Sequence, residues 1–145
     1  MTDAWNTYPP SSCIGLINAM VRKLTDLPPK QAVLKAHDEG RLVHCTWPGA
    51  DSLAISLERH MVDDAMTEWR RLDADDRWQR MQSIRKEIKR ITKRMKQKRA
   101  SPKEMDGFAA DIALFIGHEL LYADGERYLI KGPTRQEIES YDRTS

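Results

Sequence analysis

The sequence has few of the residues that mark several common classes of protein. Only two cysteines occur, Cys13 and Cys45, so a disulfide framework is not indicated, and two buried thiols in a reducing cytoplasm are expected. The seven glycines are scattered, and none of them forms a phosphate-cradling loop. The longest apolar stretch, residues 108–123, contains charged side chains, so we expect no membrane span. The first residues also lack the pattern of a signal peptide.

Motifs for metal binding and catalysis are also missing. Neither CxxC nor HxxxH occurs, and His118-Glu119 begins an HExxH motif in which Tyr122 replaces the second histidine. We therefore predict no metal, no cofactor and no enzymatic activity. An enzyme is kept as an alternative, because acidic side chains that could hold Mg²⁺ cluster in the middle of the chain. They are Asp63, Asp64, Asp73, Asp75 and Asp76.

What the sequence does contain is one strongly basic stretch. From Gln79 to Lys103, eleven lysines and arginines stand against one acidic residue, Glu87, which gives a local net charge of +10. The whole chain carries only +2, so all other residues together carry −8. A near-neutral composition therefore hides a basic segment between two acidic ones.

The basic stretch has the pattern of a helix over residues 78–99. Its apolar residues recur at steps of three and four, which places them on one stripe: Met81, Ile84, Ile88, Ile91 and Met95. The same spacing is that of a coiled-coil seam. A parallel homodimer in this register would pair Arg80 with Arg85 and Arg94 with Arg99, so an antiparallel helix from the same chain is favoured.

A second helix is predicted directly after the basic one. Ser101, Pro102 and Glu104 supply the N-cap, N1 and N3 positions of a capping box, and the helix is expected to run to about Tyr122. Its buried positions are predicted at Met105, Phe108, Ile112, Phe115 and Leu120 or Leu121. Because so few residues separate the two helices, we predict an antiparallel helical hairpin over residues 78–122.

Before the hairpin, the sequence predicts a flexible arm and shorter elements. The arm covers residues 1–10. Helices are predicted at Cys13–Leu24, Pro29–His37 and Leu53–Leu72, with a strand at Arg41–Trp47 and a turn at Pro48-Gly49. Between Leu72 and the basic helix, residues 73–76 predict a kink or a short break, with the acidic first turn of the basic helix as the alternative.

After the hairpin, a turn and a strand precede a last helix. Asp124-Gly125 predicts the turn and Arg127–Lys131 the strand, which would pair with residues before the turn or with Arg41–Trp47. A second capping box at Thr134–Glu137 opens a short C-terminal helix, followed by a tail, within residues 134–145. The fold class we predict is mainly α: a helical bundle in one domain, residues 1–145, with a long helical hairpin and a two- to three-stranded β element.

The basic side chains that lie off the apolar stripe point to an anionic partner. Seven of them form the predicted binding site: Arg85, Lys86, Lys89, Arg90, Lys93, Arg94 and Lys96. Neutralising phosphates releases counterions and gives affinity without sequence preference. Base-reading amides are limited to Gln79, Gln82 and Gln97, so sequence-specific readout by this helix is not expected. Trp78, one position off the stripe, is predicted to be an exposed, partner-binding aromatic.

We therefore predict a regulatory or accessory protein that contacts nucleic acid through the basic helix. One alternative is an adaptor or inhibitor whose helix docks on an acidic protein or mediates oligomerisation, and the oligomeric state, a homodimer included, stays open. Another is a solvated face without a partner. A helix-turn-helix at Cys13–His37 is less favoured than simple packing, because its second helix carries only Lys30 and Lys35.

Overall fold

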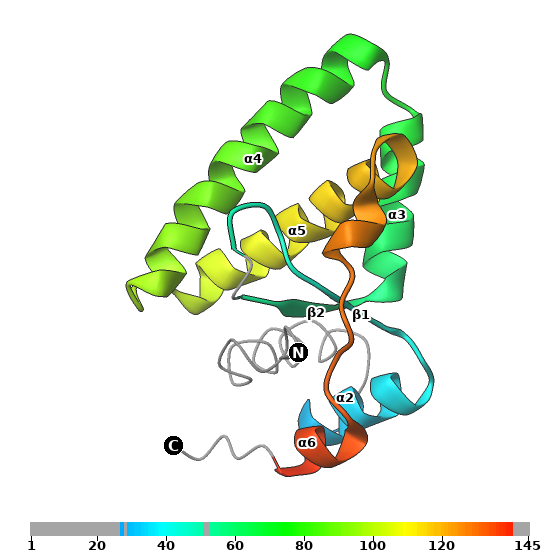
Figure 1. Cartoon of the computed structure of the whole chain (residues 1–145), viewed down its shortest axis with the longest axis vertical. Helices are drawn as coiled ribbons and strands as arrows, with labels where there is room; N and C mark the ends of the chain where they lie inside the picture. Colours follow the sequence, from blue (N-terminus) through cyan, green and yellow to red (C-terminus); the bar gives the residue numbers. More distant parts are fainter. Residues whose placement is uncertain (1–26, 28, 51–52, 141–145) are drawn as a thin grey trace. The chain divides into compact units, whose positions relative to one another are not determined.

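The computed structural model describes residues 27, 29–50 and 53–140 (Figure 1). The chain divides into two compact units, with the division after Arg59 and again before Tyr128, so that His60–Arg127 forms the second unit. The predicted arm at residues 1–10, the predicted helix Cys13–Leu24 and the tail after Ser140 lie outside the described residues. The single domain predicted for residues 1–145 stays a prediction.

The first unit combines two helices with a small sheet. Its elements are α2 (Pro29–Asp38), β1 (Leu42–Cys45), β2 (Ile55–Glu58) and α6 (Arg135–Ser140). The two strands are antiparallel, with Leu42 opposite Glu58 and Cys45 opposite Ile55. The predicted helix Pro29–His37 and the turn at Pro48-Gly49 are confirmed, and the strand predicted at Arg41–Trp47 is present with fewer residues.

Helices α2 and α6 pack on each other and share an apolar core with the strands. The buried members of this core are Ala32, Val33, Ala36, Leu42, Ala54 and Ile138. The predicted second capping box opens α6: the Thr134 Oγ1 atom accepts a hydrogen bond from the Glu137 amide at 3.2 Å. In return, the Glu137 carboxylate accepts one from the Thr134 amide at 3.3 Å.

The helix predicted over Leu53–Leu72 is wrong in its first part. Residues Ile55–Glu58 form β2 and are all buried, and only Arg59–Arg70 forms a helix, α3. A spacing of four from Leu53 through Leu57 suggested a helix, but Ile55 and Leu57 also have the two-residue period of a strand. Pairing with β1 decides between the two patterns, because buried backbone amides need hydrogen-bond partners.

The strand predicted at Arg127–Lys131 is also wrong. Residues Gly125–Tyr128 form a 3₁₀ helix, η2, and only Leu129 pairs, in an isolated bridge to Cys45. Gly125 approaches the end of the preceding helix so closely that an added Cβ would lie 2.5 Å from the Leu120 amide nitrogen. The chain therefore turns tightly at Gly125, where the turn was predicted, and continues as a 3₁₀ helix through Tyr128 where the strand was expected to begin. The bridge does join the segment to the β1 strand, one of the two pairings predicted.

The second unit contains α3, α4 (Ala74–Lys96) and α5 (Pro102–Tyr122). The predicted break before the basic helix is confirmed, because α3 ends at Arg70 and Asp73 caps α4. The Asp73 carboxylate accepts a hydrogen bond from the Asp76 amide at 2.8 Å. The acidic first turn and the basic last turn of α4 both complement the helix dipole.

Helices α4 and α5 pack along each other in antiparallel order (Figure 1). Near its start, α4 places Arg77 over the ring of Tyr122 at the end of α5, with 4.1 Å from the guanidinium carbon to the ring centroid. Near its end, Arg94 meets Glu104 at the start of α5. Residues later in α4 therefore contact residues earlier in α5, which is the antiparallel order of the predicted hairpin.

The hairpin buries the stripe that the sequence predicted. On α4, Met81, Ile84, Ile88 and Ile91 are buried, and Met95 is partly buried. On α5, the predicted Phe108, Ile112 and Phe115 are buried, whereas Met105, Leu120 and Leu121 are partly buried. The capping box at Ser101 is complete. Helix α3 also joins α5, because the Trp69 indole donates a hydrogen bond to the Leu114 carbonyl at 2.7 Å.

None of the helices in the described part of the chain is both long and apolar enough to cross a bilayer.

Candidate nucleic-acid interface

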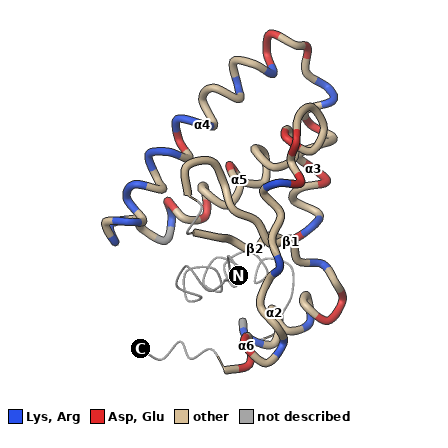
Figure 2. The backbone as a smooth tube through the Cα atoms, viewed as in Figure 1, with Lys and Arg blue, Asp and Glu red and all other residues tan. Residues whose placement is uncertain are grey.

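Basic residues recur along α4 from Arg77 to Lys96, and Glu87 is the one acidic residue among them (Figure 2). Four of them recur at steps of three, four and three, and we call these four the lysine row. They are Lys86, Lys89, Lys93 and Lys96. At about 100° per residue, the row lies roughly 140° around the helix from the buried stripe. All four side chains are exposed to solvent.

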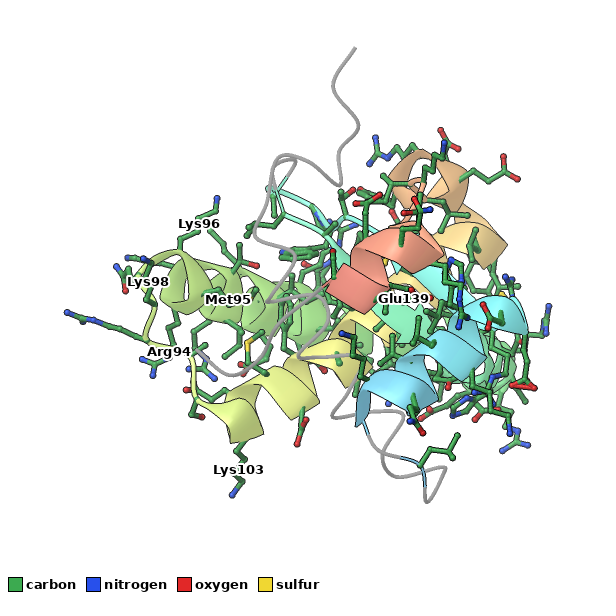
Figure 3. The ribbon with its side chains drawn as sticks, turned by 90° about the horizontal axis from the view of Figure 1, so that it is seen from below. Arg94, Met95, Lys96, Lys98, Lys103 and Glu139 are labelled. Atoms are coloured by element: carbon green, nitrogen blue, oxygen red, sulfur yellow. The ribbon has the colours of Figure 1, made fainter. Side chains whose placement is uncertain are left out.

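The lysine row has no counter-ion in the described part of the protein. None of its four members makes an ion pair or a hydrogen bond through its side chain to residues 27, 29–50 or 53–140. Two more lysines extend from the tip of the hairpin, where Figure 3 labels Lys98 after α4 and Lys103 on α5. The positive charge of the row is therefore available to a partner.

The arginines of α4 behave differently, because they reach the carboxylates of neighbouring helices. Arg85 lies 3.7 Å from the buried carboxylate of Glu119, and its guanidinium carbon is 5.2 Å from the Phe115 ring centroid. Arg80 pairs with Glu68 on α3. Both contacts tie α4 to another helix of the same unit.

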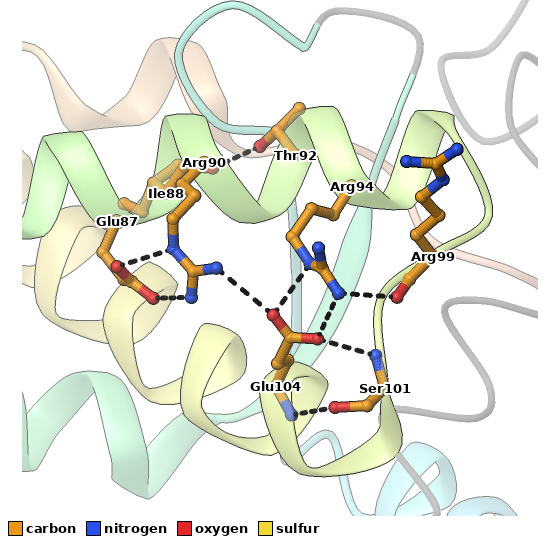
Figure 4. Close-up of polar contacts among 8 residues, drawn as sticks. All are labelled: Glu87, Ile88, Arg90, Thr92, Arg94, Arg99, Ser101 and Glu104. Atoms are coloured by element: carbon orange, nitrogen blue, oxygen red, sulfur yellow. Dashed lines mark hydrogen bonds and ion pairs between the residues drawn. The ribbon is translucent and has the colours of Figure 1, made fainter.

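Arg90 and Arg94 converge on a single carboxylate, Glu104 (Figure 4). The Arg94 Nε and Nη2 atoms lie 2.9 and 3.0 Å from its two oxygens, and Arg90 Nη1 lies at 3.3 Å. Arg90 also donates to Glu87, at 3.2 Å from Nε. The Ser101 amide and then Arg94 lower the pKa of Glu104 to about 2. This carboxylate therefore stays ionised and holds both arginines at the hairpin.

The structure thus divides the seven predicted site residues into two groups. Arg85, Arg90 and Arg94 hold the hairpin together, whereas the four lysines face solvent. The signal for this division in the sequence is residue type and not distance from the apolar stripe, because Arg90 lies about 140° around the helix from the stripe, as far as the lysine row does. The binding role of all seven stays a prediction.

Trp78 is exposed, as expected, with 65% of its surface accessible. Trp47 and Trp69 are buried, at 1% each. The exposed aromatic on α4 is therefore not simply part of the core, and its binding role also stays a prediction.

The five aspartates of the predicted acidic cluster occupy ordinary positions on α3 and α4. Asp73 caps α4, Asp75 and Asp76 lie in its first turn, and Asp63 and Asp64 are exposed on α3. Across the described residues, no group of three or more histidine, cysteine or acidic side chains is placed to hold a metal ion.

One pair with catalytic potential was not anticipated from the sequence. The His44 Nδ1 atom lies 2.5 Å from the Ser56 hydroxyl, because the two residues face each other across the β1–β2 pair. Burial lowers the pKa of His44 to about 4, so the ring is neutral and could accept a proton at pH 7. Ser56, however, has no surface accessible to solvent, so a substrate could not reach its hydroxyl.

The predicted helix-turn-helix is described only in its second half, α2. That helix buries Ala32, Val33 and Ala36 and packs on α6, while Lys30 and Lys35 are exposed. Its first helix lies outside the described residues. The lysine row is therefore the strongest candidate for a functional surface in the described chain.

Comparison of this chain with protein-family models, with curated proteins and with solved structures finds no match.

Proposed function

We propose that this protein is a non-enzymatic accessory or regulatory protein that contacts nucleic acid through the lysine row. The observation that carries the proposal is the contrast on α4, where the arginines are occupied within the hairpin and the four lysines are exposed without counter-ions among the described residues. Structural needs account for the arginines. They do not account for the lysines, whose charge remains available to an external anion.

The geometry of the row suits a phosphate backbone. Lys86 and Lys96 are ten residues apart, which is about 15 Å along a helix. A line of flexible ammonium groups can follow a line of phosphates without a fixed match between individual groups, and each phosphate neutralised releases counterions. Four contacts of this kind are expected to give sequence-independent binding, with a dissociation constant on the order of micromolar to 0.1 mM at physiological salt.

The test is a charge reversal within the row. The double substitution Lys89→Glu and Lys93→Glu leaves Arg90 and Arg94 on Glu104 and places two negative charges among the remaining lysines. We expect the affinity for a labelled 20-nucleotide oligonucleotide, measured by fluorescence anisotropy, to fall at least about tenfold at 0.1 M salt. The slope of log K against log salt should become shallower by about 2.

A matched control distinguishes the effect of losing the lysine row from the effect of changing the net charge. Lys30→Glu with Lys35→Glu makes the same change in total charge on the exposed face of α2. This control should bind nearly as the unsubstituted protein does. Equal loss in both variants, or an affinity that does not change with salt, would contradict the proposal. If the protein co-purifies with an acidic protein rather than with nuclease-sensitive material, the adaptor alternative is favoured instead.

A further inference from the structure

The lysine row continues toward the start of α4 with two side chains that are not basic. Gln82 lies four residues before Lys86, and Trp78 lies four residues before Gln82. At about 100° per residue, these two and the four lysines fall within an arc of about 80° on the helix surface. Helix α4 is continuous from Ala74 to Lys96, so an exposed indole and the lysine row share one face.

Trp78 is the most exposed of the large hydrophobic residues in the described chain. Its exposure of 65% compares with 43% for Tyr122, 39% for Leu129 and 37% for Leu27. The indole makes no hydrogen bond and no ring contact with the described residues. Tryptophan usually buries most of its surface, so an indole left in water on a charged face indicates a partner.

The two cations nearest to Trp78 in sequence are occupied elsewhere. Arg77 lies over the ring of Tyr122, and Arg80 pairs with Glu68 and lies 5.6 Å from the Trp69 ring centroid. Neither of these arginines covers the Trp78 ring. The flat faces of the indole are therefore available for stacking.

We propose that the partner is a single strand of nucleic acid, with one base stacked on Trp78 and the following phosphates on the lysine row. This inference rests on the proposed function. In a duplex, the faces of the bases are covered by their neighbours, so a rigid indole on a helix surface can reach them only where the strand is unpaired. Stacking on an aromatic side chain does not depend on base identity, which fits a row of lysines that also reads no sequence.

The length of the face sets the size of the site. Trp78 and Lys96 are eighteen residues apart, which is about 27 Å along the helix and at most about eight nucleotides, the number at the 3.4 Å rise of a strand in a stacked duplex. A 12-nucleotide strand therefore covers the whole face.

The experiment compares three probes at fixed salt: a 12-nucleotide deoxythymidine strand, an abasic strand of the same length and a 12-base-pair duplex. The abasic strand keeps the phosphates and removes the bases. We expect the intact protein to bind the deoxythymidine strand about 5- to 150-fold more tightly than the abasic one, as stacking energies of single bases imply. Trp78→Ala should remove that difference and leave abasic binding unchanged, and Trp78→Phe should keep most of it.

The outcomes distinguish stacking on Trp78 from nucleic-acid contact by the lysine row. If Trp78→Ala binds the deoxythymidine strand as the intact protein does while the lysine variant does not, stacking is refuted and nucleic-acid contact stands. If Trp78→Ala weakens the binding of all three probes equally, the substitution acts by disturbing helix α4, and stacking is again refuted. If no probe binds, both proposals are overturned. If polyglutamate binds more tightly than the strands, both are also overturned and an acidic protein is the favoured partner.

Discussion

At the scale of single residues, Asp111 is a carboxylate whose ionisation opposes the fold. It lies on α5 and is partly buried, and burial, followed by repulsion from Glu87, raises its pKa to about 6. Arg80 acts in the opposite direction but does not cancel these effects. Because the folded-state pKa lies above the usual value of 3.8, the charged form is disfavoured in the folded protein.

We predict that Asp111→Asn stabilises the protein at pH 7.5. Above pH 6 the natural residue is charged in both states and weakens the fold, and this penalty is lost as the pH falls from about 6 toward 4. Urea unfolding of both proteins at several pH values measures the effect. A difference in the free energy of unfolding that stays constant between pH 4 and pH 7.5 would show that the ionisation of Asp111 is not its source.

Residue identity also explains why the seven predicted site residues divide into two groups. The sequence shows that Arg85, Arg90 and Arg94 lie off the apolar stripe, but not that Glu104 and Glu119 on the next helix lie within their reach. The planar guanidinium group suits such paired carboxylate contacts better than an ammonium group does. Arginine at the paired positions and lysine along the exposed row is the signal that separates the two groups.

At the scale of elements, the turn between α4 and α5 depends on one carboxylate. Glu104 completes the capping box with Ser101 and also receives Arg90 and Arg94, so the start of α5 is joined to the end of α4 by charge. Its pKa of about 2 lies below the usual 4.5. The stabilisation it gives is therefore present above about pH 4.5 and lost as the pH falls toward 2.

We predict that Glu104→Gln destabilises the protein at pH 7 and that the difference from the natural protein disappears by about pH 2. Ser101→Ala should cost about 1 kcal/mol, as the loss of an N-cap does, at every pH. Asp106→Asn, an exposed position on the same helix, serves as the control and should change little. Thermal unfolding followed by circular dichroism measures all three. A Glu104→Gln penalty that persists at pH 2 would contradict the role given to its charge.

Elements differed in how well the sequence predicted them. The hairpin followed from local signals alone, namely the steps of the stripe on α4 and the capping box at Ser101. Strand β2 could not be predicted from local signals, because Leu53, Leu57 and Met61 have the spacing of a helix. The strand is favoured by its pairing with residues 42–45. Local patterns thus identify elements that are stabilised locally and miss those that depend on a distant partner.

At the scale of the whole molecule, a net charge of +2 conceals two different uses of positive charge. Four of the five arginines between Gln79 and Lys103 contact acidic residues of the second unit, so their charge is balanced inside it. The lysine row is not balanced in this way. Composition alone reveals neither use, because both depend on which side of α4 a residue occupies.

The division between lysines and arginines makes the charges that hold the hairpin chemically distinguishable from the charges proposed to bind a strand. Acetylation consumes primary amines and spares guanidinium groups, so acetylated α4 would lose the charge of its row and keep Arg90 and Arg94 on Glu104. We expect acetylated protein to keep its circular dichroism spectrum while its affinity for the strand falls at least about tenfold. Strand binding that survives complete acetylation would exclude the row as its source. A cellular acetyltransferase acting on α4 would likewise release a bound strand from a protein that remains folded.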